Sequence, residues 1–123
     1  MTKEEIEEYD RLDKAIRDEN VGLLAGFRDW LTTKTLSRST ISKHINYADA
    51  YMQYLLYYDV YSCRNSVDFY GFFGWYDRKC TSGKSKEAYA SLKKYYTFLH
   101  ENQLANDSMI EQVKEAKEYF DDF

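Results

Sequence analysis

The sequence contains no proline, five glycines and two cysteines among its 123 residues. The lack of proline favours long helices, since proline breaks a helix interior. Two cysteines, Cys63 and Cys80, are too few for a disulfide scaffold, and we expect both to be reduced thiols. The longest apolar runs are only a few residues, so no segment reaches the roughly 20 apolar residues of a membrane span.

The first residues lack the pattern of a secretory signal peptide. The initial methionine is followed closely by Lys3, Glu4 and Glu5, with no apolar stretch after them. We therefore expect a cytoplasmic protein. Residues 120–123 read Phe-Asp-Asp-Phe, an acidic ending that is typical of a natural C-terminus, so we expect the chain to be complete.

The composition excludes a disordered chain. Hydrophobic residues make up 44% and aromatic residues 18%, including 13 Tyr and 7 Phe, which is enough to form a core. The length suits one core and leaves no room for a second, since a single domain typically holds about 100–150 residues.

Charge is distributed unevenly along the chain. The formal net charge is −4, which ordinarily argues against a nucleic-acid-binding protein. Residues 1–19 carry four basic and eight acidic side chains, and residues 106–123 carry two and six. The segment that lies between these two ends, residues 20–105, carries eleven basic and seven acidic side chains. This pattern permits a local basic face between two acidic helices, although alternating charges on solvated helix faces give the same counts.

The N-terminal third is expected to form two helices. Thr2 precedes acidic residues and is a typical N-cap for a helix over residues 3–18. Its apolar side chains recur at helical spacing at Tyr9, Leu12 and Ile16. Gly22 predicts a break. The second helix has one apolar face formed by Leu24, Phe27 and Leu31.

A long helix is expected over residues 39–58, capped by Ser37 or Ser39. One row of apolar residues at helical spacing comprises Ile41, Ile45, Ala48, Met52 and Leu55. A second row comprises Tyr47, Tyr51, Tyr54 and Tyr58. A helix that is apolar on two sides is packed on both flanks, so we expect this helix to be central.

A short aromatic helix is expected over residues 67–79, with Ser66 as its cap. Gly71 and Gly74 cost helix stability but allow close packing against a neighbour.

Two further helices complete the prediction, over residues 86–101 and 108–121. Ser85 caps the first, and Asn106 or Asp107 caps the second. Their inward residues are Ala88, Leu92, Tyr95 and Leu99, and then Ile110, Val113 and Phe120. The sequence thus predicts an all-α single domain, a compact bundle of five or six helices.

No constellation of residues indicates catalysis. Four side chains could in principle bind zinc: Cys63, Cys80, His44 and His100. They lack the paired short spacings that are typical of a zinc site. The acidic clusters at residues 4–8 and 121–122 are typical of solvated helix faces. His44 is interpreted as an exposed histidine at a helix edge. We expect no enzyme activity, no metal and no cofactor.

The order of four segments is similar to that of a known family. The segments are Phe27-Arg-Asp-Trp-Leu31, Ser39-Thr40-Ile41, Tyr51-Met-Gln-Tyr-Leu-Leu56 and Tyr89-Ala-Ser-Leu-Lys-Lys-Tyr-Tyr-Thr-Phe-Leu-His-Glu-Asn-Gln-Leu104. Over residues 21–105 the chain resembles the N-terminal core-binding (SAM-like) domain of phage integrases, the tyrosine recombinases. The matching features are helix starts and core periodicity.

This resemblance implies a helical bundle that lies on one side of duplex DNA. Family members place the starts of the second and fourth helices against the major groove and its phosphates. The positions that correspond here are Arg38, Ser39, Thr40, Lys43, His44, Lys84, Ser85, Lys86, Ala90, Lys93 and Lys94.

The residues themselves agree in part. The face of the helix over 86–101 that lies opposite its core stripe is formed by Lys86, Ala90, Lys93 and Thr97. Helix starts at Ser39 and Ser85 would also offer backbone N–H groups to phosphate oxygens. The alternative is that the lysines form an ordinary solvated face.

The catalytic domain of the family, with its Arg, His-x-x-Arg and nucleophilic Tyr, is missing from these residues, so we expect no strand cleavage. One hypothesis is a stand-alone module of a phage or mobile element that binds double-stranded DNA and assists or regulates recombination and integration. The other is a protein-interaction module whose acidic ends dock a basic partner, for example a recombinase.

Overall fold

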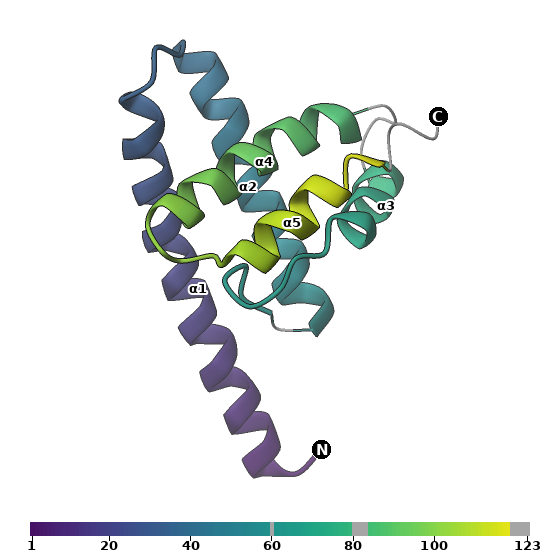
Figure 1. Cartoon of the computed structure of the whole chain (residues 1–123). Coiled ribbons are helices and arrows are strands. Elements are labelled where there is room, and N and C mark those ends of the chain that lie inside the picture. The colour runs from purple at the N-terminus through teal and green to yellow at the C-terminus, as the bar shows by residue number, and fades with distance from the viewer. Residues whose placement is uncertain (60, 80–83, 119–123) are drawn as a thin grey trace.

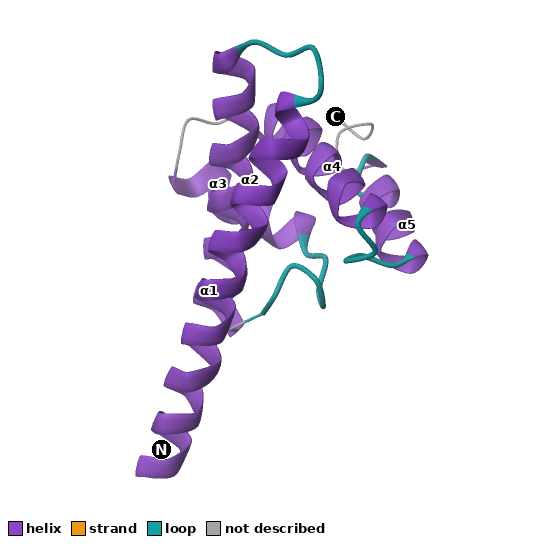
Figure 2. Cartoon of the chain, turned by 90° about the vertical axis from the view of Figure 1, so that its left-hand side faces the viewer, coloured by secondary structure: helices purple, strands orange, loops and turns teal. Residues whose placement is uncertain are grey.

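Five α-helices make up the described part of the chain, which comprises residues 1–59, 61–79 and 84–118 of a computed structural model (Figure 1). In chain order the helices are α1 (Lys3–Thr32), α2 (Arg38–Asp59), α3 (Phe69–Lys79), α4 (Ser85–Glu101) and α5 (Asp107–Glu115). No strand occurs in these residues, which confirms the all-α prediction (Figure 2). Within the same ranges, no helix has the length and apolar character needed to cross a membrane.

The first helix is continuous, so the predicted break at Gly22 is wrong. Gly22 lies on the exposed side of α1, while Leu23 and Phe27 next to it are buried against the bundle. The burial of these side chains outweighs the roughly 1 kcal/mol that a glycine costs inside a helix. The predicted N-cap is confirmed, because the backbone N–H of Glu5 donates to the Thr2 hydroxyl over 3.1 Å.

The first half of α1 extends beyond the other helices in both views (Figures 1 and 2). We call residues 3–15 the arm. Every residue of the arm is exposed except the half-buried Asp13, and Ile16 is the first buried side chain of α1. The apolar spacing of Tyr9 and Leu12 thus continues the core stripe of α1 into the arm, where these two side chains are 45% and 49% exposed.

The second helix is the central one, as predicted. It packs against α1, α3 and α4, and α4 crosses it (Figure 1). The first predicted row is buried along its whole length, at Ile41, Ile45, Ala48, Met52 and Leu55. In the second row Tyr47, Tyr51 and Tyr54 are buried, but Tyr58 is 53% exposed.

Hydrogen bonds between tyrosines connect the interior of the bundle. The hydroxyls of Tyr51 on α2 and Tyr96 on α4 lie 2.9 Å apart, and both residues are fully buried. The Tyr96 hydroxyl also lies 3.0 Å from the carbonyl oxygens of Cys63 and Ser66. These bonds attach the α2–α3 connection to the core, since buried hydroxyls are stable only when they are hydrogen-bonded.

The observed helix caps differ from the predicted ones at two of five helices. Asp68 rather than Ser66 caps α3, where its carboxylate accepts from the N–H of Gly71 over 3.0 Å. Ser85 is the first residue of α4 and not its cap; the preceding residue, Lys84, makes no capping hydrogen bond through its side chain. The α2 cap is Ser37, which accepts from the N–H of Thr40 over 3.2 Å.

The last helix begins as predicted and ends earlier. Asn106 caps it by accepting from the N–H of Met109 over 2.9 Å, and the helix ends at Glu115. Val113 is buried and Ile110 is half-buried against the core. The predicted inward residue Phe120 and the second cysteine, Cys80, lie outside the described residues.

Candidate nucleic-acid interface

The starts of α2 and α4 meet where the two helices cross. His44 on α2 and Ser91 on α4 are both buried there, and the His44 Nδ1 atom lies 2.7 Å from the Ser91 hydroxyl. The prediction of an exposed His44 is therefore wrong. Burial lowers the pKa of His44 from its usual 6.5, and the positive charges of Lys94 and Lys43 lower it further. The imidazole is a neutral structural contact and is turned away from solvent.

A carboxylate that the sequence did not single out lies next to this contact. Glu87 on α4 accepts from Lys43 over 2.7 Å and from the Tyr47 hydroxyl over 2.5 Å, and the Nζ atom of Lys84 is 3.9 Å away. The hydrogen bonds from Lys43 and Tyr47 lower the pKa of Glu87 to about 2. Two of the predicted DNA-contacting lysines, Lys43 and Lys84, therefore share one acidic partner.

The outer face of α4 carries lysines without such a partner. The four residues of the predicted face, all of them exposed, are Lys86, Ala90, Lys93 and Thr97. The opposite face, at Leu92 and Leu99, is fully buried, so the predicted orientation of the helix is confirmed. Neither Lys86 nor Lys93 forms an ion pair with any residue in the described ranges. Lys94, on the neighbouring row, is half-buried, and its charge lowers the pKa of His44.

The start of α2 presents small polar side chains. Arg38 and Ser39 are exposed, and Thr40 is half-buried with its hydroxyl 2.9 Å from the Ser37 hydroxyl. Arg38 forms no ion pair within the described part of the chain. Ser85, at the start of α4, is buried, so its hydroxyl is not part of the exposed surface.

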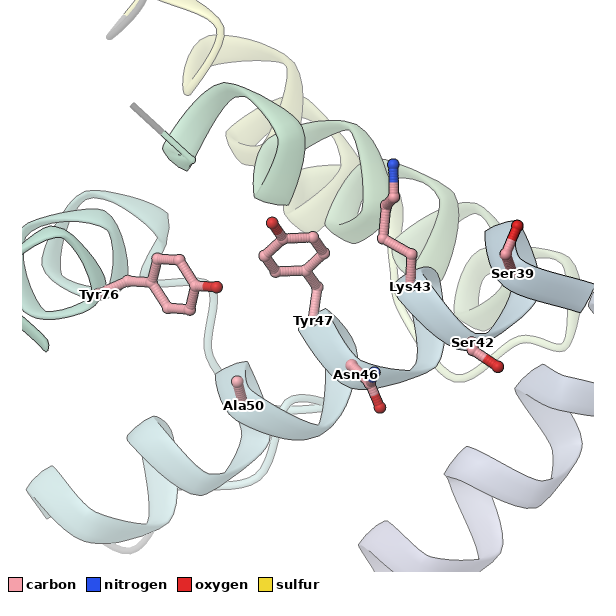
Figure 3. A pocket seen from close by; sticks show the side chains of 7 residues that line it. All are labelled: Ser39, Ser42, Lys43, Asn46, Tyr47, Ala50 and Tyr76. Carbon is pink, nitrogen blue, oxygen red and sulfur yellow. The ribbon is translucent and has the colours of Figure 1, made fainter. Parts of the chain in front are cut away.

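A hollow of about 430 Å³ flanks α2 beside these residues (Figure 3). The residues that line it are Ser39, Ser42, Lys43, Asn46, Tyr47, Ala50 and Tyr76. The rings of Tyr47 and Tyr76 approach each other across it, with centroids 5.7 Å apart. Burial and the bond to Glu87 raise the pKa of Tyr47, so its hydroxyl stays protonated and acts as a donor.

The first part of α2 and almost the whole of α4 form a strongly basic region. Residues 34–48 and 84–100 contain seven Lys and Arg side chains and a single acidic one, Glu87. Helix packing and the Lys43–Glu87 ion pair hold the two segments together. We call the exposed part of this region, with Arg38, Lys84, Lys86 and Lys93, the basic face.

Within the described residues, no three His, Cys, Asp or Glu side chains come together to hold a metal ion. Cys63 is buried in the core, where burial raises the pKa of its thiol to about 12. His100 lies at the far end of α4, 2.8 Å from Asp107. The residues with possible metal-binding chemistry are thus dispersed.

No protein-family model, curated protein or solved structure matches this chain.

Proposed function

We propose that the chain is a non-catalytic module that binds double-stranded DNA through the basic face. The bundle would have the topology of the SAM-like core-binding domain of phage integrases, which the sequence resembles, and would assist or regulate site-specific recombination. Binding would depend mainly on phosphate contacts, because the basic face offers flexible lysines and backbone N–H groups more than side chains suited to reading bases.

The observation that carries the proposal is the row of exposed residues on α4. Lys86 and Lys93 lie two turns apart on one face, with the small residue Ala90 between them. A small residue there lets the helix backbone approach a phosphate, and two unpaired ammonium groups can then bind neighbouring phosphates. Surface lysines that form structural ion pairs, such as Lys43 with Glu87, would not be so available.

The starts of α2 and α4 add favourable dipoles to the same region. The first turn of a helix exposes N–H groups that bind anions. Lys84 makes no side-chain cap on α4, and the cap of α2, Ser37, satisfies only the N–H of Thr40. Phosphate oxygens are suitable acceptors for the N–H groups that remain.

The experiment is fluorescence anisotropy with a labelled duplex of roughly 30 base pairs, comparing the wild-type chain with the variant Lys86→Glu/Lys93→Glu. We expect the double reversal to weaken binding at least about tenfold, since each lysine would otherwise release a counterion from DNA. A matched control, Lys3→Glu/Lys14→Glu, changes the net charge equally on the arm. It should bind like wild type at near-physiological salt, where charges more than about 8 Å away are screened.

Equal affinity of the wild-type chain and the Lys86→Glu/Lys93→Glu variant would reject the basic face as the DNA site. Equal loss in both double variants would show that net charge alone is responsible. Circular dichroism checks that the helices of every variant are retained, which is expected because all four lysines are exposed.

A second candidate function is a protein-interaction module that keeps the bundle without binding DNA. The observation that favours it is the arm, whose apolar side chains Ile6, Tyr9 and Leu12 remain 47%, 45% and 49% exposed. In this case the partner would contact the acidic ends of the chain, and the basic face would be an ordinary solvated surface.

A further inference from the structure

The arm continues the core stripe of α1 beyond the bundle. Ile16 and Leu23 are buried on the face of α1 that packs onto the body, and Tyr9 lies seven residues before Ile16 on the same face. Leu12 lies four residues before Ile16, and Ile6 three before Tyr9, so both adjoin this face. In the views of Figures 1 and 2, no other described helix lies along this part of α1. An apolar stripe of Ile6, Tyr9 and Leu12 is therefore left uncovered.

Acidic side chains border the stripe. The four carboxylates that lie one helical turn from a stripe residue are Glu5, Glu8, Asp10 and Asp13. Glu8 pairs with Arg11 over 2.7 Å and Asp13 with Arg17 over 2.8 Å. Glu5 and Asp10 form no ion pair with any other residue that the structure describes. Residues 1–19 as a whole carry eight acidic and four basic side chains, so a partner of positive charge is favoured.

The same charges disfavour a second copy of this chain as the partner. An antiparallel pair of arms centred on Tyr9 would place Ile6 against Leu12 of the other copy. It would also place Glu5 opposite Asp13 and Glu8 opposite Asp10, and like charges across a helix pair are destabilising. A second arm thus matches the apolar stripe but not the acidic borders.

The stripe opens into a hollow where the arm joins the bundle. The hollow has a volume of about 480 Å³, and its walls include Leu12, Ile16 and Tyr61. Tyr61 is 46% exposed although it lies beside the buried Ile16. A helix lying along the arm could therefore place a terminal apolar side chain in this hollow.

We propose that the arm is a docking site for a cationic amphipathic helix of a partner protein. The apolar face of that helix would cover Ile6, Tyr9 and Leu12, and its lysine or arginine residues would lie against the acidic borders. Helices that dock through such a stripe present anchors at i, i+3, i+4 and i+7. The site is on a different surface from the basic face and does not depend on DNA binding.

The test uses a fluorescent peptide of about four helical turns, with leucines at i, i+3, i+4 and i+7 and lysines at the other positions. A second peptide has every leucine replaced by alanine and keeps the same charge. Both are titrated at near-physiological salt with the whole chain and with the variant Ile6→Ala/Leu12→Ala. Alanine is the best helix former, so the arm of this variant stays helical. The control is Val21→Ala, which removes a 70% exposed apolar side chain elsewhere on α1.

We expect the leucine peptide to bind the wild-type chain and the Val21→Ala variant equally. It should bind the Ile6→Ala/Leu12→Ala variant at least about tenfold more weakly, because two apolar contacts are lost. The alanine peptide should bind wild type more weakly by a similar factor. The Lys86→Glu/Lys93→Glu variant should bind the leucine peptide normally, which separates this site from the proposed DNA site.

Equal binding of the leucine peptide to wild type and Ile6→Ala/Leu12→Ala would overturn the proposal, as would equal binding of the two peptides. Sedimentation equilibrium of the chain alone is the third readout. A wild-type dimer that the Ile6→Ala/Leu12→Ala variant converts to a monomer would show that a second copy covers the stripe.

Discussion

The Nδ1 atom of His44 lies 2.7 Å from the hydroxyl of Ser91, and both residues are buried where α2 crosses α4. One helical turn before Ser91 on α4, Glu87 binds Lys43 over 2.7 Å. These two contacts hold the starts of α2 and α4 together. They bring Lys43 and Lys84, which lie 41 residues apart in the sequence, to the same carboxylate.

The His44 contact predicts a pH-dependent stability. The pKa of His44 is lowered in the folded chain by burial and by Lys94 and Lys43, whereas in the unfolded chain it takes its usual value of 6.5. Between these two values the unfolded chain binds more protons than the folded one. The free energy of unfolding should therefore be highest above pH 6.5 and fall as the pH drops toward the lowered value.

Urea unfolding from about pH 7.5 to about pH 5 measures this effect. The matched variant is His44→Asn, which keeps a polar group near Ser91 but does not titrate. Its free energy of unfolding should depend less on pH than that of wild type. The pKa of Glu87 is lowered from its usual 4.5 to about 2 in the folded chain, so Glu87 also loses stabilising energy toward the acid end of this range; both proteins contain Glu87, and this loss cancels in the comparison. Parallel pH profiles for wild type and His44→Asn would contradict the burial of a neutral His44.

A second prediction concerns the only acidic side chain of residues 34–48 and 84–100. Replacing Glu87 by Gln removes a negative charge and releases Lys43 and Lys84 from their shared partner. We expect tighter DNA binding and a lower melting temperature, because the ion pair also joins α2 to α4. The control is Glu111→Gln, which breaks the exposed ion pair with Lys114 on α5.

Anisotropy and thermal unfolding of the two variants separate these effects. Glu111→Gln should change both quantities little, as expected for an exposed pair. Weaker DNA binding by Glu87→Gln than by Glu111→Gln would contradict the assignment of Lys84 to the basic face.

A third prediction compares two glycines. A Cβ atom at Gly71 would overlap the Tyr54 hydroxyl and lie 2.6 Å from the Asp68 carboxylate, so Gly71→Ala should destabilise the chain by about 1–3 kcal/mol. At Gly22 nothing lies within 4 Å of a Cβ atom. Gly22→Ala should therefore stabilise α1 by about 0.5–1 kcal/mol. Equilibrium urea unfolding measures both, and a destabilising Gly22→Ala would contradict a continuous α1.

The core of α2 and α4 could be predicted from the sequence because its signal is periodic. Rows such as Ile41 to Leu55 repeat over four helical turns, and several apolar residues contribute to each assignment. A single residue gives a weaker signal. Gly22 predicted a break, but it interrupts no buried contact, so α1 continues through it. Gly74 likewise has open space around it, and only Gly71 has the close approach that was expected of both.

The site was less predictable because its contacts join distant segments. The exposed lysines of α4 follow from helical spacing within one element. The burial of His44 depends on Ser91, and the role of Glu87 depends on Lys43 and Tyr47, each about 40 residues away. No local pattern distinguishes a histidine at a helix crossing from an exposed one. The cap of α3 was predicted wrongly because Ser66 and Asp68 are both good N-cap residues, and the sequence does not show that the helix begins at Phe69.

The most direct test of the central claim is the salt dependence of DNA binding by the whole chain. Anisotropy of a duplex of roughly 30 base pairs is measured from about 50 mM to about 200 mM salt. With about four to six phosphate contacts on the basic face, the association constant should fall by about two to three orders of magnitude across this range. No binding at the lowest salt, where weak electrostatic complexes are favoured, would contradict the assignment of the basic face to DNA.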